Sequence, residues 1–241
     1  MNRKFAARLL HASCALLIGL SAPQASAALI APTGATASST DFAGRDPIYA
    51  INGSGLTADS NVATGFRHNT SASNYMWNTV GRGQDNNPFI LFDLGARYDV
   101  SRLFLWNFNE EIGNPANNPC CTGFGMRDVI ISAGTTANAL TTVGQYQFQE
   151  ATGLSSYGGE IINLQITDVQ FVLFTPLNTW SGTVFGPNYS TPPGLDEGRG
   201  ITGLSEVRFD VGPASTVPEP GTLALFGLAI AGLSLRKRRM R

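Results

Sequence analysis

The stretch Pro-Phe-Ile-Leu-Phe-Asp-Leu-Gly at residues 88–95 decides the fold class. Its side chains alternate, so that Phe92 and Leu94 point to one face of a strand and Asp93 points to the other, which is the pattern of a half-buried β-strand. Gly95 permits the turn that follows. The stretch therefore predicts a strand that covers a hydrophobic core with one face and meets solvent with the other.

Five further runs of this kind follow, separated by clusters of Gly, Asn, Pro, Ser and Thr. They are rich in Val, Ile, Leu and Phe, and no interior segment shows an amphipathic helical stripe. The runs lie at residues 100–108, 127–133, 159–166, 169–175 and 204–211. Many short strands joined by polar loops predict an all-β protein, an antiparallel β-sandwich.

The second run places its aromatic residues on one face of the strand. These are Phe104, Trp106 and Phe108, while Leu103, Leu105, Asn107 and Asn109 alternate with them on the other face. We expect the aromatic face, and also Trp77, to lie in the core. Asn107, Asn109 and Glu110 gather where the strand ends, and amides and carboxylates there either bind sugar hydroxyls or form caps and turns.

Both ends of the chain carry targeting patterns. Basic residues, an apolar run at 9–20 and the small residues Ala25 and Ala27 predict a secretory signal peptide over residues 1–27. At the other end, Pro218-Glu219-Pro220 precedes an uncharged run of 14 residues at 222–235, and five of the last six residues are basic. This run is shorter than the roughly 20 apolar residues of a full transmembrane helix.

The three C-terminal parts, in this order, resemble the PEP-CTERM sorting signal of Gram-negative bacteria. The resemblance implies recognition by an exosortase-type enzyme, transient anchoring in the inner membrane by an apolar helix, and delivery to a cell surface or biofilm matrix rich in exopolysaccharide. Pro218 and Pro220 would hold the chain extended for such an enzyme. The predicted layout is a signal peptide (1–27), a flexible lead-in (28–37), the domain (38–211), a linker (212–217) and the sorting signal (218–241).

The charge balance of the domain differs from that of the whole chain. Half of the 16 Lys and Arg residues lie in the two terminal segments, so residues 28–217 carry 8 arginines and no lysine against 16 acidic residues, a formal charge of −8. A nucleic-acid-binding domain needs a basic patch. The composition therefore argues against nucleic acid as a partner.

Two cysteines remain in the domain, the adjacent Cys120 and Cys121. An exported protein meets an oxidising environment, in which a vicinal disulfide would stiffen this loop. Two unlinked loop residues, or bridges between chains, are the alternatives. A metal site is disfavoured, because His68 is the domain's single histidine and adjacent cysteines are poorly placed around a tetrahedral ion.

Six motifs in sequence order resemble the discoidin, or coagulation-factor type C, family. They are Ala50-Ile51-Asn52-Gly53-Ser54-Gly55-Leu56, Met76-Trp77, Ile90-Leu91-Phe92-Asp93-Leu94-Gly95, Leu105-Trp106-Asn107-Phe108-Asn109-Glu110, Arg127-Asp128-Val129-Ile130-Ile131-Ser132 and Gly203-Leu204-Ser205-Glu206-Val207-Arg208-Phe209. The resemblance implies a galactose-binding-like jelly-roll sandwich over residues 38–211, which recognises carbohydrate, lipid or protein. Fold alone does not name the ligand.

Sugar sites combine an aromatic platform with planar polar side chains. We expect Trp180, His68 and Arg127 to contribute to such a site, together with Asn107, Asn109 and Glu110. A solvated loop histidine is the alternative for His68. Residues 121–126 replace the Arg-Gly segment that the resemblance would place before Arg127.

The resemblance also implies a structural Ca²⁺ between Asn52 and Glu206. Calcium takes several oxygen ligands and prefers carboxylates, so an Asn in place of an Asp weakens the site. A tight turn at Asn52-Gly53 is the alternative.

Three functional hypotheses follow from these observations. The first is a non-catalytic surface module that binds polysaccharide, and the second is a matrix or adhesion protein that uses the same fold for protein contacts. The third is an enzyme, which we do not expect, because the spacing of the acidic residues singles out no catalytic pair. The acidic residues considered are Asp93, Glu110, Glu111, Asp196 and Glu197.

Overall fold

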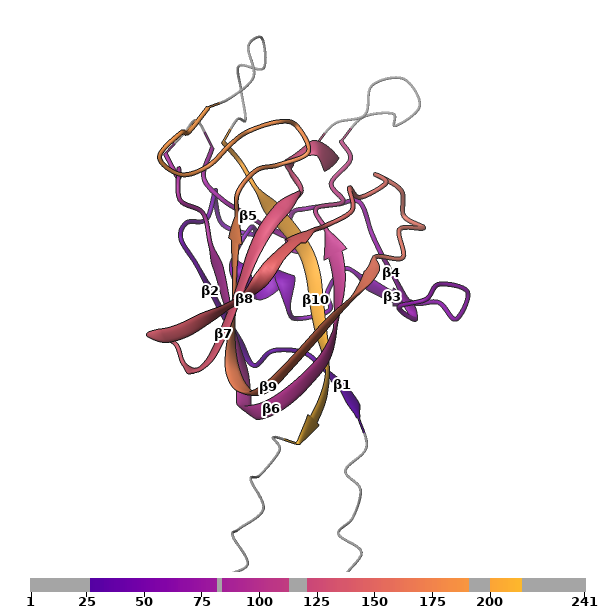
Figure 1. The fold of residues 1–241 in the computed structure, drawn as a ribbon. Coiled ribbons are helices and arrows are strands. Elements are labelled where there is room, and N and C mark those ends of the chain that lie inside the picture. The colour runs from indigo at the N-terminus through magenta and orange to yellow at the C-terminus, as the bar shows by residue number, and fades with distance from the viewer. Residues whose placement is uncertain (1–26, 82–83, 113–120, 191–199, 214–241) are drawn as a thin grey trace, which may run out of the picture.

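The computed structural model describes residues 27–81, 84–112, 121–190 and 200–213, and these form an antiparallel β-sandwich (Figure 1). Its strands are β1 (Ala28–Ile30), β2 (Gly34–Ala37), β3 (Leu56–Ala58), β4 (Phe66–His68), β5 (Trp77–Asn78), β6 (Ile90–Asn107), β7 (Asp128–Thr136), β8 (Ala139–Gln147), β9 (Glu160–Pro176) and β10 (Gly203–Pro213). Two short 3₁₀ helices, η1 (Pro47–Ala50) and η2 (Thr122–Phe124), lie in the connections.

Two long bent strands, β6 and β9, build both layers of the sandwich. In one layer, the first part of β6 pairs with β2 and with the second part of β9. The second part of β9 also pairs with β7, and β7 pairs with β8. The second part of β6 pairs with β10 and with the first part of β9, and β10 pairs with β1 and β5. The predicted runs at 88–94 and 100–108 therefore belong to one strand, as do those at 159–166 and 169–175.

The bends of β6 and β9 lie side by side. Their pairing shifts register between Asp93 and Val100, where Gly95 has φ +84°. On β9, Gln165 and Asp168 also have positive φ, and Asp168 forms an ion pair with Arg97. Bulges of this kind bend a strand without ending it, which is why the sequence pattern was interrupted while the strand was not.

The hydrophobic core fills the space between the two layers. Phe92 contacts Phe174 within its own layer and Phe209 of the opposite layer, at ring-centre distances of 5.1 and 6.1 Å. Phe92 and Leu94 are buried and Asp93 is partly exposed, as the opening stretch predicts. Edge-to-face contacts between buried aromatic rings add stability beyond the area that they remove from water.

The second part of β6 is buried on both faces, which the sequence pattern did not predict. Leu103 and Leu105 face the main core. On the outer face, Phe104 and Trp106 form a second cluster with Ala151 and Tyr157 from the connection between β8 and β9. The expectation that Trp77 and Trp106 are buried is confirmed.

Two predicted boundaries are wrong. Residues 28–37 are not a flexible lead-in, because β1 pairs with β10 and β2 pairs with β6. Each of these two short strands has one pairing neighbour and so lies at an edge of a sheet. Likewise β10 continues through Gly212 and Pro213, which pair with Asp99 and Tyr98, so the linker does not begin at residue 212.

The described chain enters and leaves the sandwich at one end, which we call the terminal end, where Ala28 pairs with Val211 (Figure 1). The opposite end, called the loop end, is where β6, β8 and β9 finish and β7 and β10 begin. No helix among the described residues is long and apolar enough to cross a membrane. The predicted signal peptide, apart from Ala27, and the sorting signal lie outside the described residues.

Candidate ligand-binding site

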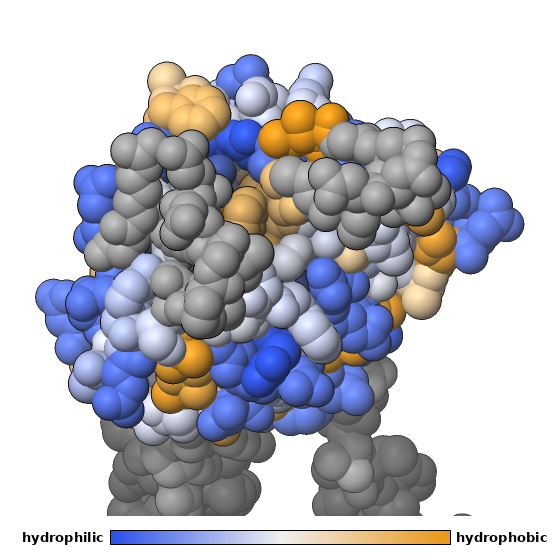
Figure 2. Space-filling view, turned by 90° about the horizontal axis from the view of Figure 1, so that it is seen from above, coloured by the Kyte–Doolittle hydropathy of each residue, from blue (hydrophilic) through white to orange (hydrophobic). Residues whose placement is uncertain are grey.

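The loop end carries mostly polar side chains with isolated hydrophobic ones, as Figure 2 shows in the view from above. Three strand termini meet there: Asp128 begins β7, Gln147 ends β8, and Pro176 ends β9. Asp128 pairs with Gln147, and Val129 pairs with Pro176. The sheet therefore brings the segment after β9, which contains Trp180, next to the start of β7.

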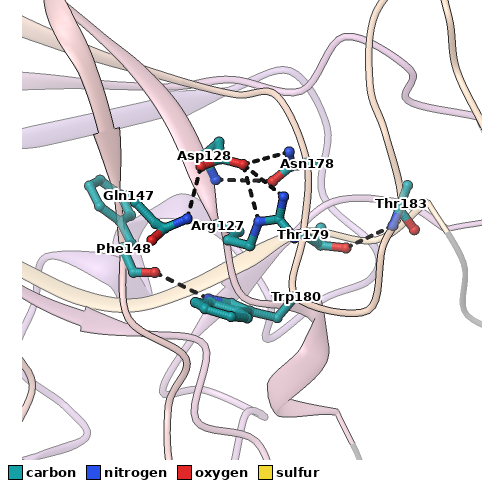
Figure 3. Close-up of polar contacts among 8 residues, drawn as sticks. All are labelled: Arg127, Asp128, Gln147, Phe148, Asn178, Thr179, Trp180 and Thr183. Atoms are coloured by element: carbon teal, nitrogen blue, oxygen red, sulfur yellow. Dashed lines mark hydrogen bonds and ion pairs between the residues drawn. The ribbon is translucent and has the colours of Figure 1, made fainter.

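Five residues form what we call the Trp180 cluster: Arg127, Asp128, Gln147, Asn178 and Trp180 (Figure 3). The indole Nε1 of Trp180 donates a hydrogen bond of 3.2 Å to the carbonyl oxygen of Phe148. The guanidinium carbon of Arg127 lies 5.9 Å from the centre of the indole ring, within cation–π distance. The hydrogen bond to Phe148 orients the ring. Because Trp180 is only half-buried, the residue also reaches the surface.

Asp128 is the centre of the polar part of the cluster. Its Oδ2 accepts hydrogen bonds from Asn178 Nδ2 at 2.7 Å and from Arg127 Nη2 at 3.0 Å, and its Oδ1 accepts one from Gln147 Nε2 at 3.3 Å. The hydrogen bond from Asn178, followed by Arg127, lowers the pKa of Asp128 below its usual value. The carboxylate is therefore ionised at neutral pH, and it fixes three planar polar groups beside one aromatic ring.

Backbone hydrogen bonds hold the loop that presents Trp180. Trp180 donates its N–H to the carbonyl of Gly125, and Thr179 and Thr183 form a tight loop in which Thr183 N–H reaches Thr179 Oγ1 at 3.2 Å. The side-chain amide of the neighbouring Asn178 accepts the backbone N–H of Asp128 and donates a hydrogen bond to the Asp128 carboxylate. The ring is therefore positioned by the fold before any ligand arrives.

Of the six predicted ligand residues, the structure brings Arg127 and Trp180 together, and it places His68 elsewhere, in the interior. The His68 side chain lies on β4, has no exposed surface, and its Nδ1 lies 3.0 Å from the carbonyl of Asn69. Gly55 packs against its ring so closely that a Cβ there would lie 2.2 Å from Nε2. The prediction that His68 contacts a ligand is wrong, because the β3–β4 hairpin folds its imidazole inward.

Burial gives His68 a pH-dependent effect on stability. Desolvation lowers the pKa of His68 to about 4, although the backbone carbonyls of Asn69 and Tyr75 oppose the shift. The unfolded chain keeps a pKa near 6.5, so it binds more protons than the folded chain between these values. The stability that depends on neutral His68 is present above pH 6.5 and is lost as the pH falls toward 4.

We predict that the difference in unfolding free energy between the wild type and His68→Phe falls by about 3 kcal/mol from pH 7 to pH 4. Denaturant titrations at several pH values measure this difference, in which other titrating groups cancel. A difference that stays constant over this range would contradict the assignment of a buried neutral imidazole.

Asn107 and Asn109 are also buried, so their predicted contact with a ligand is wrong as well. Neither has exposed surface. Asn107 Nδ2 donates to the carbonyls of Met126 and Gln149 at 2.7 and 2.8 Å, and its Oδ1 accepts from Met126 N–H at 3.0 Å. The alternative, that such amides hold strand ends and turns, is what the structure shows.

Asn109, two residues later, also hydrogen-bonds to the backbone of neighbouring loops. Its Nδ2 lies within hydrogen-bond distance of the carbonyls of His68, Asn69 and Leu154, and its Oδ1 accepts from Gly153 N–H at 2.9 Å. The amide therefore joins the loop after β8 to the β4 hairpin.

Glu110 does not face a ligand either, because it is engaged in a buried ion pair. Its Oε1 lies 2.5 Å from Nη2 of Arg45, and the two side chains are 10% and 9% exposed. Arg45 precedes η1, so the pair ties the entry loop to the end of β6.

The residues predicted to hold calcium do not fit that ion. Oδ1 of Asn52 accepts the N–H of Ser54, the two carboxylate oxygens of Glu206 face Gly53 N–H and Arg208, and Glu206 itself is fully buried. Burial raises the pKa of Glu206 above its usual value, although Arg208 and the N–H of Gly53 oppose the shift. A calcium ion would therefore compete for Glu206 with a proton as well as with these two donors. Within the described ranges, no group of three or more His, Cys, Asp and Glu side chains could hold a metal.

Cys121 is disulfide-bonded, and its partner lies outside the described residues, as Cys120 does. The vicinal disulfide stays a prediction. Asp196 and Glu197 also lie outside the described ranges, and Asp93 lies on the first part of β6, just before its bend, whereas Glu110 follows the end of that strand.

Three members of the Trp180 cluster were not predicted. Asp128 and Asn178 stand beside predicted residues, one position after Arg127 and two before Trp180, and this adjacency was the available signal. Gln147 ends β8, whose Thr- and Gln-rich sequence shows little apolar alternation, so nothing in the sequence marked it.

Comparison with known proteins identifies the C-terminal segment directly. Residues 216–239 match the PEP-CTERM protein-sorting motif. This confirms the predicted sorting signal and marks an exported protein that an exosortase sorts. No curated protein matches the chain.

The solved structures with which the chain shares similarity include family 32 carbohydrate-binding modules. One is the module of Clostridium perfringens NanJ in complex with galactose, with 17% identity, a TM-score of 0.46, and coverage of 76% of this chain and 98% of that one. Another is CpGH89CBM32-5 from Clostridium perfringens in complex with GalNAc-β-1,3-galactose, with 12% identity, a TM-score of 0.45, and coverage of 73% and 94%. A third is the module of AlyQ in complex with 4,5-unsaturated mannuronic acid, with 17% identity, a TM-score of 0.41, and coverage of 76% and 97%.

Proposed function

We propose that this protein is a non-catalytic carbohydrate-binding module, displayed on the surface or in the extracellular matrix of a Gram-negative bacterium after sorting by an exosortase. Its ligand would be a polysaccharide, such as the exopolysaccharide of the cell that exports it. The observation that carries the proposal is the Trp180 cluster, in which an oriented indole ring stands beside planar polar side chains at the loop end (Figure 3).

The cluster has the two features by which proteins recognise sugars. The apolar face of a sugar ring packs on an aromatic ring, and its hydroxyl groups need donors and acceptors held in place. Trp180 supplies the ring, and the amide of Gln147, which is exposed, and the partly exposed guanidinium of Arg127 supply polar groups. Because Asp128 already holds these groups, binding requires little further ordering of side chains.

The sorting motif supports the same proposal. A chain exported and sorted through the motif at residues 216–239 would meet extracellular polysaccharide at the cell surface. Pro213, the last described residue before that motif, pairs with Tyr98 at the terminal end of the sandwich, opposite the loop end that carries the Trp180 cluster (Figure 1).

The test is retention of the purified domain, residues 28–217, in gels that contain a panel of bacterial polysaccharides. We predict saturable retardation by at least one polysaccharide, and binding weakened roughly 30-fold in Trp180→Ala, because truncating a central Trp costs about 2 kcal/mol or more. Leu29→Ala, an exposed apolar side chain of β1 at the terminal end, is the matched control and should bind as the wild type does.

A folded domain that no polysaccharide retards would contradict the proposal. In that event, self-association of the same sample would support the matrix or adhesion protein, the other hypothesis compatible with the sequence. Equal retardation of the wild type and of folded Trp180→Ala would place the ligand elsewhere on the surface.

A further inference from the structure

Arg208 lies where the resemblance to the discoidin family implied a calcium ion. Its Nη1 donates a hydrogen bond of 2.6 Å to the carbonyl of Ile51, and its Nη2 lies 2.9 Å from Oε1 of Glu206. The other carboxylate oxygen of Glu206 accepts Gly53 N–H at 2.9 Å. The guanidinium therefore joins a buried carboxylate of β10 to the backbone of the Asn52–Gly53 turn.

Arg208 contacts one of the two implied calcium ligands, Glu206, and a backbone carbonyl, that of Ile51, both of which are kinds of group that calcium binds. Calcium binds six to eight oxygens, drawn from carboxylates and backbone carbonyls. Here a single planar cation donates a hydrogen bond to one carbonyl oxygen and lies within ion-pair distance of one carboxylate oxygen. A guanidinium suits such a pair because it is always charged and presents its donors in a rigid fork.

The turn is shaped around this cation. Gly53 has φ +73°, and a Cβ there would lie 2.6 Å from Nη2 of Arg208. Glycine is therefore required both for the backbone conformation and for the close approach of the guanidinium. Arg208 side-chain exposure is 15%, so most of the charge is shielded from water and its partners are not exchanged freely with solvent.

We propose that Arg208 is an internal cation that replaces a divalent metal ion, fixing the Asn52–Gly53 turn to β10 through Ile51 and Glu206. The domain then keeps this turn ordered without calcium. The inference is independent of the proposed carbohydrate function, because it concerns the turn beside β10 and not the Trp180 cluster.

The test compares thermal melting of residues 28–217 at pH 8.5 in millimolar CaCl₂ and in EDTA, for the wild type, Arg208→Ala and Arg102→Ala. The high pH favours ionised Glu206. The described strands all lie within this fragment. Arg102 pairs with Asp210 but is 47% exposed, which makes it the matched control.

We expect the wild-type midpoint to stay within about 1 °C between CaCl₂ and EDTA. We expect Arg208→Ala to lower the midpoint by roughly 3–8 °C, because it leaves a buried carboxylate without its cation, and Arg102→Ala to lower it by much less. Arg208→Lys should recover part of the loss.

A wild-type midpoint that rises by several degrees in calcium or falls in EDTA would overturn the proposal, as would a loss in Arg208→Ala no larger than in Arg102→Ala. Should Arg208→Ala fail to fold, Arg208→Lys and the wild-type comparison decide the question without it.

Discussion

Replacing Asn107 by alanine should lower the free energy of unfolding by about 3–5 kcal/mol. The substitution removes hydrogen bonds to both backbone groups of Met126 and to the carbonyl of Gln149, all at the buried end of β6. Each buried polar group left unpaired costs about 1–3 kcal/mol. Domains of this kind are stable by about 5–15 kcal/mol, so the variant should lose a large share of its stability.

Two companion variants identify the cause of the loss. Asn107→Asp keeps the shape but cannot donate to the two carbonyls, so it should be destabilised as well, and more so at neutral pH than in acid. Asn87→Ala removes an exposed asparagine and should change the free energy by about 0.5 kcal/mol or less. Urea denaturation measures all three, and a loss below about 1 kcal/mol for Asn107→Ala would show that Asn107 does not hold these segments together.

Breaking the ion pair between Arg45 and Glu110 should cost about 3–5 kcal/mol when only one partner is removed. The two atoms that meet lie 2.5 Å apart, and both side chains are about nine-tenths buried. Within the described part of the chain, Nε and Nη1 of Arg45 are buried without a hydrogen-bond partner, and besides the ring of Phe42, 5.2 Å from its guanidinium carbon, Glu110 is the group that balances this charge. Glu110→Gln therefore leaves the buried guanidinium of Arg45 without an anionic partner.

The double variant Arg45→Leu/Glu110→Leu should be more stable than either single variant and should lie close to the wild type, because no buried charge remains. A double-mutant cycle by chemical denaturation measures this coupling. The exposed pair of Arg97 and Asp168 serves as the control, since Arg97→Ala should shift the melting temperature little. Additive losses in the double variant would show that the two charges do not depend on each other.

The sequence predicts the core of this sandwich well because alternation marks strands with one buried face. Phe92, Leu94 and Trp77 are buried as expected, and the paired runs of β6, β7, β9 and β10 were all anticipated. What the pattern could not show is that both faces of the second part of β6 are covered, the face of Leu103 and Leu105 by the main core and the opposite face by the connection between β8 and β9. For this reason Asn107 and Asn109 were expected at the surface, although loops after β8 enclose them.

Two of the five residues of the Trp180 cluster were predicted, and three were missed for a related reason. Trp180 stands in a polar loop and Arg127 at the start of a predicted strand, and local sequence is enough to expect them near the surface. His68 stands in an equally polar stretch, yet the β3–β4 hairpin turns it inward against Gly55. The direction of a side chain in a short hairpin depends on register with its partner strand, and register is set by residues distant in the sequence.

The most direct test of the carbohydrate-binding proposal uses the protein's own tryptophans. Of the three tryptophans of the chain, Trp77 and Trp106 have no exposed surface, and Trp180 is half-buried. Acrylamide added to residues 28–217 should therefore quench the fluorescence of Trp180 first. We predict that a polysaccharide that retards the domain in a gel also protects Trp180 from acrylamide, in a saturable way, and that Trp180→Phe loses this response. A polysaccharide that binds while quenching of Trp180 stays unchanged would contradict the account.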